Sequence, residues 1–261
     1  MAPLKNSIFA RPVAVRLYGL SAIVLGLVGL VWGDFASVWQ PVPKSLPGRT
    51  ALAYAVAAVF LIAGLAMQAK RTARLGALSV TGLYGLGVIL LHLPELATKP
   101  SVFVVWSGAA EQLALVAGGL VAYAFCAPSR TENAHRLVKG AQYLFGVCLI
   151  FFGLAHLFYL KQTADAVPAW IPPGQAFWAY ATAAGHFAAA IAILTGIATR
   201  VATVLLTAMF IVFGLFVHAP AAFADPHSHF NWAANAVNFG LIASAWAIAA
   251  SYTAPLHDAP R

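Results

Sequence analysis

The sequence of 261 residues contains very little charge. Asp and Glu together number 7, Lys and Arg number 15, and charged residues make up 8% of the chain, against roughly 25% in a soluble domain. Hydrophobic residues make up 62%, more apolar surface than a soluble fold of this length can bury. The low charge therefore excludes an ordinary soluble protein and indicates that the lipid bilayer surrounds the chain.

Cysteine is also scarce, and motifs of known chemistry are absent. Cys126 falls at an expected helix end and Cys148 inside an apolar run, so we expect no structural disulfide. The sequence has no HExxH, CxxCH or nucleotide-binding motif. Its net charge of +8 comes without a basic helix face, which excludes nucleic acid as a partner and favours contact with anionic lipid headgroups.

What the sequence does have is eight apolar runs. Each is long enough to cross a bilayer core about 30 Å thick as a helix of ~20 residues. We therefore expect an all-α fold, a polytopic membrane bundle. The expected spans are 14–33, 50–68, 73–93, 102–125, 137–159, 176–196, 199–218 and 231–251. The expected connections between them include 94–100, 128–139, 161–174 and 220–231.

Lys and Arg are distributed unevenly between alternate connections. With the N-terminus in the cytoplasm, four of the 15 lie outside, at Lys44, Arg49, Lys99 and Lys161, and the other eleven lie inside. A positive-inside bias of this size predicts that both termini are cytoplasmic. We expect a multi-pass protein of a bacterial inner membrane.

The second half of the chain repeats the first at an offset of 126 residues. The recurring positions include His92 and His218, Pro94 and Pro220, Trp106 and Trp232, and Arg74 and Arg200. We interpret the chain as two four-helix repeats, residues 1–128 and 129–261. Because each repeat has an even number of spans, the repeats should share one orientation and be related by an axis along the membrane normal.

Polar side chains within the spans are few, and each needs a reason because burial in lipid is costly. The candidates for a ligand-binding site are Glu111, His156, His186, His218, Asn235 and Asn238. Asn231, Asn235 and Asn238 share one helix face. All lie near the midplane or in the half expected to face outward, which predicts an outward-facing cavity and not a continuous channel.

Differences between the two repeats show which of these polar residues are the better site candidates. Phe60 is the counterpart of His186, Trp32 of His156, and Val237 of Glu111. Polar residues found in only one repeat are better site candidates than shared ones, so His92 and His218 are also interpreted as helix-end residues. Structural roles stay open for every candidate: the asparagines as glue between helices, and Glu111 and His186 as a buried pair.

Histidines from several helices could also converge on a metal ion or a haem. No motif in the sequence supports either one, and we assign no catalytic residue. Trp170, Trp178, Tyr180 and Trp232 flank helix ends, as aromatic residues do at a membrane surface, with the mouth of a ligand cavity as the alternative.

The second half resembles the DoxX-like membrane proteins of bacteria. The resemblance is carried by VPAWIP at 167–172, FWAY at 177–180, GHFAA at 185–189, ILTG at 193–196, and by Arg200 and His218-x-Pro220. The first half matches more faintly. The family is named for a membrane subunit of a thiosulfate:quinone oxidoreductase, and other members are linked to redox homeostasis. The resemblance thus implies a quinone ligand and a redox partner subunit. Many relatives have Glu near the position of His186, so this chain departs from the family pattern there.

Three functions follow from these features. The first is a redox-associated membrane subunit that binds a quinone or a small reductant in the outward cavity. The second is a non-enzymatic membrane scaffold or assembly partner. The third is a small-solute transporter, against which stands the lack of polar groups in the cytoplasmic half of the spans.

Overall fold

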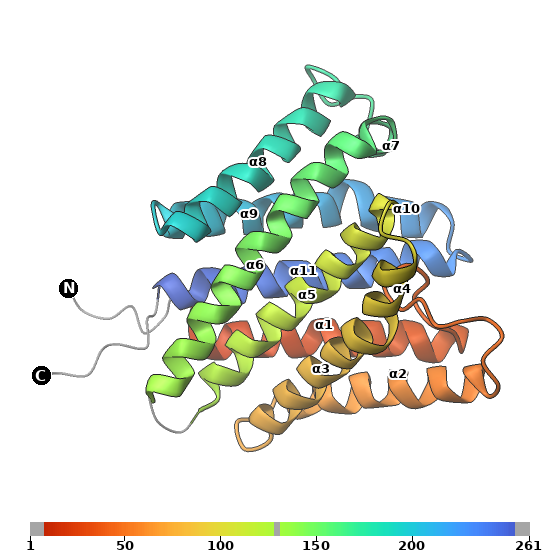
Figure 1. The fold of residues 1–261 in the computed structure, drawn as a ribbon, viewed down its shortest axis with the longest axis vertical. Coiled ribbons are helices and arrows are strands. Elements are labelled where there is room, and N and C mark those ends of the chain that lie inside the picture. Colours follow the sequence, from red (N-terminus) through yellow and green to blue (C-terminus); the bar gives the residue numbers. More distant parts are fainter. Residues whose placement is uncertain (1–7, 128–130, 254–261) are drawn as a thin grey trace, which may run out of the picture.

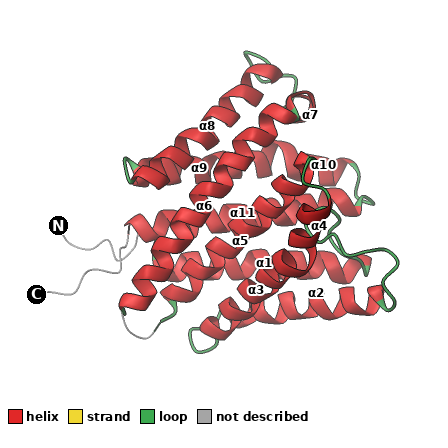
Figure 2. Ribbon diagram, in the orientation of Figure 1, coloured by secondary structure: helices red, strands yellow, loops and turns green. Residues whose placement is uncertain are grey.

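The computed structural model describes residues 8–127 and 131–253, which form helices and loops and no strand (Figures 1 and 2). The helices of the first half are α1 (Arg11–Trp32), α2 (Arg49–Ala66), α3 (Ala73–Gly87), η1 (Val88–His92), α4 (Leu93–Thr98) and α5 (Phe103–Phe125). Those of the second half are α6 (Glu132–Phe158), α7 (Leu160–Ala166), α8 (Gln175–Thr195), α9 (Thr199–Phe213), η2 (Gly214–His218), α10 (Ala219–Ala224) and α11 (His229–Thr253). Eight helical stretches are long and apolar enough to span a membrane, which confirms the expected all-helical membrane bundle.

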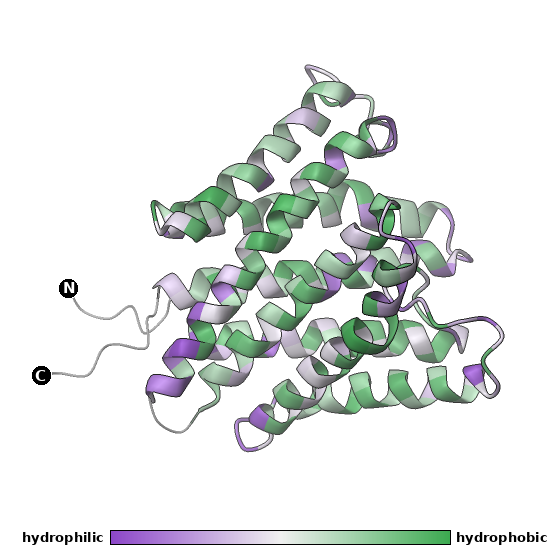
Figure 3. Cartoon of the chain, viewed as in Figure 1, coloured by the Kyte–Doolittle hydropathy of each residue, from purple (hydrophilic) through white to green (hydrophobic). Residues whose placement is uncertain are grey.

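Polar residues gather at the two ends of the bundle, with apolar helix surface between them (Figure 3). The C-terminal ends of α2, α5 and α8 lie at one end, which we call the basic end (Figure 1). Lys70, Arg136 and Arg200 belong to it. The short helices α4, α7 and α10 lie at the opposite end.

The four long helices of each half, which we call the first and the second bundle, differ in how they close. In the first bundle α1 packs on α2, α2 on α3, α3 on α5, and α5 back on α1. In the second bundle α6 packs on α8, α8 on α9, and α9 on α11, but α6 does not pack along α11. Instead α5 packs against both α6 and α11, and α1 packs against α11. A helix of the first half therefore completes the wall of the second bundle.

The first bundle has a filled interior. Phe60 is 2% exposed and packs against Tyr84, with ring centroids 5.0 Å apart. The Tyr18 hydroxyl donates to the carbonyl of Leu115 at 2.7 Å. Large aromatic side chains thus occupy the centre of this bundle, and the second bundle carries His186 where the first carries Phe60.

The helices α6 and α11 meet at the basic end through one buried hydrogen bond. The Gln142 amide Nε2 donates to the Ser251 hydroxyl at 2.8 Å, and Ser251 in turn donates to the carbonyl of Ile248 at 2.6 Å. Both polar side chains are buried. This contact joins the two helices at the basic end.

Replacing Ser251 by alanine should lower the free energy of unfolding by about 1–2 kcal/mol, because the buried Gln142 amide loses its acceptor. Thermal unfolding in detergent measures the change. The double replacement Gln142→Leu with Ser251→Ala removes both partners and should recover most of the loss. An unchanged midpoint in Ser251→Ala would show that the contact does not hold the helices together.

Several connections expected from the sequence are wrong in part, because helix continues into them. Residues 94–100 and 220–231 begin with α4 and α10, which follow α3 and α9 without a break. Proline removes an N–H donor and clashes with the carbonyl four residues earlier. The π-helices η1 and η2 accommodate this: Leu93 N–H bonds to the carbonyl of Val88, and Ala219 N–H to that of Gly214, each five residues back. The two π-helices lie 126 residues apart.

Two other boundaries move for local reasons. Helix α6 begins at Glu132, inside the connection expected at 128–139, because the Thr131 hydroxyl caps it by accepting from Ala134 N–H at 3.2 Å. The connection expected at 161–174 contains α7, a short helix ending before Val167.

Candidate functional site

A cavity of about 530 Å³ lies inside the second bundle, in the half away from the basic end. Its walls come from α6, α7, α8, α9, η2 and α11, together with Trp39 and Glu111 from the first half of the chain. Glu111, His156, His186, His218 and Asn238 line the cavity. The structure therefore brings five of the six site candidates predicted from the sequence to one place. Asn235 does not line it.

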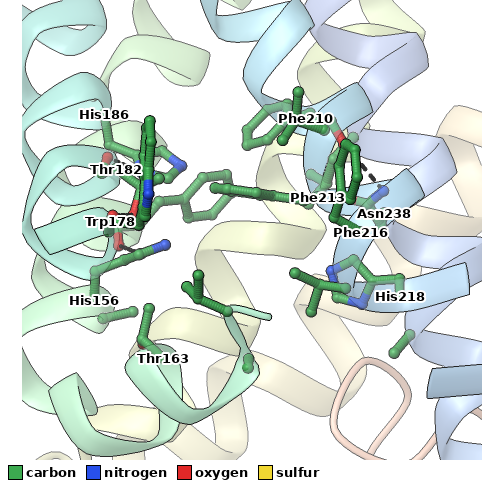
Figure 4. A pocket seen from close by; sticks show the side chains of 18 of the residues that line it. His156, Thr163, Trp178, Thr182, His186, Phe210, Phe213, Phe216, His218 and Asn238 are labelled. Carbon is green, nitrogen blue, oxygen red and sulfur yellow. Dashed lines mark hydrogen bonds between the residues drawn. The ribbon is translucent and has the colours of Figure 1, made fainter. Parts of the chain in front are cut away.

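Two histidines lie side by side on the wall formed by α6 and α8 (Figure 4). The ring centroids of His156 and His186 are 4.8 Å apart. His156 Nδ1 lies 2.9 Å from the carbonyl oxygen of Phe152, and His186 Nδ1 lies 2.8 Å from that of Thr182. Each histidine is therefore tied to its own helix one turn back, which fixes the direction of the ring.

Aromatic side chains surround this pair. The His186 ring lies 5.8 Å from that of Phe152, 5.7 Å from Phe210 and 6.2 Å from Phe213, measured between centroids. His156 stacks on Phe213 at 6.0 Å. His186 itself is 1% exposed. The imidazoles therefore face an apolar, water-poor space.

The opposite wall carries His218 and Asn238 (Figure 4). His218 ends the π-helix η2, and Asn238 lies in the middle of α11. The Asn238 amide Nδ2 donates to the carbonyl of Phe210 at 3.3 Å. Asn238 thus ties α11 to α9, one turn before the π-helix η2 begins.

Glu111 reaches the cavity from α5 and is held by a tryptophan. Its carboxyl oxygen accepts a hydrogen bond from Trp39 Nε1. The carbonyl of Trp39 in turn lies 3.1 Å from Nε2 of the buried His92. The pairing of Glu111 with His186, left open by the sequence, is replaced by this contact with Trp39. His92 has a structural role in the first half, whereas its counterpart His218 lines the cavity.

The mouth of the cavity opens between α8 and α9. These helices leave their short connection close together and diverge toward the opposite end (Figure 1). Trp170, on the loop after α7, meets Phe216 of η2 across this opening, with ring centroids 6.0 Å apart. Trp170 is 71% and Val212 47% exposed although both line the cavity. The apolar lining is therefore continuous with the outer, lipid-facing surface of the bundle.

Among the described residues, no group of three or more His, Cys, Asp or Glu side chains is placed to hold a metal ion. His156 and His186 lie on the same wall and next to each other. Two axial ligands of one haem stand on opposite faces of its ring, which this pair does not provide.

The fold and the cavity define an integral, multi-pass membrane protein with a buried apolar site. The family model described as DoxX matches residues 142–219, from α6 to the start of α10. The segment from α6 to the start of α10 is thus similar to the DoxX family. His156, His186 and His218 lie within the matched segment, whereas Glu111 and Asn238 lie outside it. No curated protein and no solved structure matched the chain.

Proposed function

We propose that this protein is a redox-associated membrane protein that binds a quinone in the cavity of the second bundle. The observation that carries the proposal is the pair of oriented imidazoles, His156 and His186, set in an aromatic wall. A quinone is an apolar ring with oxygen atoms on its edge, so it needs such a combination: flat apolar walls for the ring and a few polar groups for the oxygens.

The size and shape of the cavity support this ligand class. A volume of about 530 Å³ falls within the range of roughly 300–1,000 Å³ typical of small-molecule sites. Phe152, Phe210 and Phe213 offer ring faces and edges for stacking. Glu111, His156, His186, His218 and Asn238 are the proposed ligand-binding residues.

The position of the mouth favours a ligand that is dissolved in lipid. Trp170 and Phe216 stand at an apolar opening on the side of the bundle, and a membrane quinone could enter there without crossing water. This apolar opening favours the quinone over the small reductant as the ligand.

We also propose a location and an orientation for the protein. We place it in a bacterial inner membrane with both termini in the cytoplasm, and we divide the chain into the repeats 1–128 and 129–261. The cavity then opens in the outward half of the bilayer. A redox partner subunit would supply or accept the electrons.

Replacing His186 by phenylalanine, the residue of the first bundle at the corresponding position, should abolish quinone binding or weaken it at least about tenfold. The larger ring fills part of the cavity, and one polar contact is lost. Quenching of tryptophan fluorescence by an added short-chain quinone, in detergent-solubilised protein, measures the affinity. The matched control is His227→Phe, because His227 is exposed in the connection before α11.

The outcomes separate the proposed functions. Binding that is lost in His186→Phe and kept in His227→Phe supports a quinone site in this cavity. Wild-type protein that binds no quinone would contradict the proposal and favour a scaffold whose polar residues hold the helices together.

A further inference from the structure

The protonation of the two wall histidines follows from their hydrogen bonds. A carbonyl oxygen only accepts, so a ring nitrogen at 2.8–2.9 Å from one must carry the proton. In both His156 and His186 this nitrogen is Nδ1. In the neutral imidazole the other nitrogen, Nε2, then has a lone pair and no hydrogen. Both wall histidines are thus hydrogen-bond acceptors toward anything they face.

These acceptor atoms point into the cavity. Nε2 stands at the far end of the ring from the helix backbone, and Figure 4 shows both rings directed toward the space between the two walls. Both residues line that space. A ligand lying against this wall therefore meets two lone pairs.

The other polar groups on the same wall have already used their hydrogens. The Trp178 indole N–H donates to the carbonyl of Pro172 at 3.0 Å. The Thr182 hydroxyl donates to the carbonyl of Trp178 at 2.8 Å. Together with the two histidines, these are the polar residues by which α6 and α8 line the cavity. The side chains of α6 and α8 on this wall accept hydrogen bonds and offer no N–H or O–H to a ligand. Next to them, the Thr163 hydroxyl of α7 can donate or accept.

The opposite wall can form hydrogen bonds with either redox form of the ligand. A neutral His218 has one N–H and one lone pair, and the Asn238 amide has both donor and acceptor atoms. A ligand oxygen on that side can be satisfied whether or not it carries a hydrogen. The wall of α6 and α8 therefore decides which form of the ring is preferred.

We propose that the cavity is built for the reduced, dihydroxy form of the ring, a quinol, in preference to the quinone. This inference rests on the proposed function and states which of the two redox forms the site holds more tightly. A quinol hydroxyl donates to Nε2 of His156 or His186. A quinone carbonyl has no hydrogen to donate, so its lone pairs face those of the histidine Nε2 atoms. The buried imidazole nitrogens are then left unsatisfied.

The test compares a quinone and its quinol with the same ring and the same short alkyl tail, under anaerobic conditions with purified full-length protein in detergent. Calorimetric titration gives both affinities. One unsatisfied buried acceptor corresponds to a factor of about ten in affinity, so the quinol should bind at least about tenfold more tightly. The dimethyl ether of the quinol, which keeps the oxygens but has no hydroxyl hydrogen, should bind no better than the quinone.

A variant assigns the preference to the histidines. In the double replacement of His156 and His186 by phenylalanine, the affinities of the forms that still bind should differ by less than about threefold. The control His227→Phe should keep the full difference in affinity between quinol and quinone. Three results with wild-type protein would overturn the inference and leave the proposed function standing. They are equal affinities for quinone and quinol, a higher affinity for the quinone, and an affinity for the ether equal to that for the quinol. A preference that survives in the double variant also overturns it. Failure of every form to bind wild-type protein overturns both.

Discussion

Replacing Gly118 by valine is expected to prevent the chain from folding into a stable bundle. Gly118 lies where α5 of the first half crosses α11 of the second half. A Cβ atom built there would stand 2.6 Å from the Cα of Ser244, so the two helix backbones would have to separate. Overpacking commonly costs about 1–3 kcal/mol, and we expect a cost at the upper end or beyond because backbone must move. Yield of monodisperse protein and its thermal midpoint measure the effect.

Gly140→Val is the matched control. Gly140 lies in the interior of α6, and a Cβ added there meets nothing within 4 Å. This variant should stay within about 1 kcal/mol of the wild-type protein. Equal behaviour of the two variants would contradict the close α5–α11 packing that joins the halves.

Replacing Trp39 by alanine should lower the free energy of unfolding by about 3–5 kcal/mol, the range for truncation of a large buried aromatic. Trp39 is 9% exposed and stacks on Phe230 of α11 at 5.7 Å between centroids. It also donates to Glu111 and is held through its carbonyl by His92. The substitution thus removes a cavity wall and leaves the Glu111 carboxyl without its donor.

Trp39→Phe separates these two effects. Phenylalanine retains most of the ring packing and removes only the N–H donor, so the thermal midpoint should fall much less than in Trp39→Ala. Ligand affinity should still change, because Glu111 is no longer held in place. If Trp39→Phe and wild-type protein bind the quinone equally well, Glu111 does not contribute to the site through this hydrogen bond.

The architecture could be predicted from composition because a bilayer imposes strong constraints on a chain. Every spanning segment must be apolar and long enough to cross the hydrocarbon core, so the eight runs were visible in the sequence. The helix ends were less predictable. Pro94 and Pro220 predict the ends of two spans, whereas a π-helical turn before each proline lets the helix continue. Nothing in local composition distinguishes that turn from an ordinary helix end.

The candidate site could be predicted in part. Polar residues that cost free energy in lipid, such as Glu111 and His186, were evident because they interrupt apolar spans. Trp39 was missed, since it lies in a connection and its role depends on a contact with α5, 72 positions along the chain. Helix periodicity places Asn235 on the same face of α11 as Asn238, but only Asn238 lines the cavity. The hydrogen bonds that fix His156 and His186 also required the structure.

Photolabelling with a short-chain azido-quinone, in membranes that contain the protein, tests directly whether a quinone binds in the second bundle. We expect label on the segments that line the cavity, 152–171 and 210–218. An excess of unlabelled quinone should prevent this labelling, and His186→Phe should abolish it. Label confined to the exposed apolar surface of α2 and η1, at residues such as Ile62 and Leu90, or label that unlabelled quinone does not reduce, would contradict a quinone site in the second bundle.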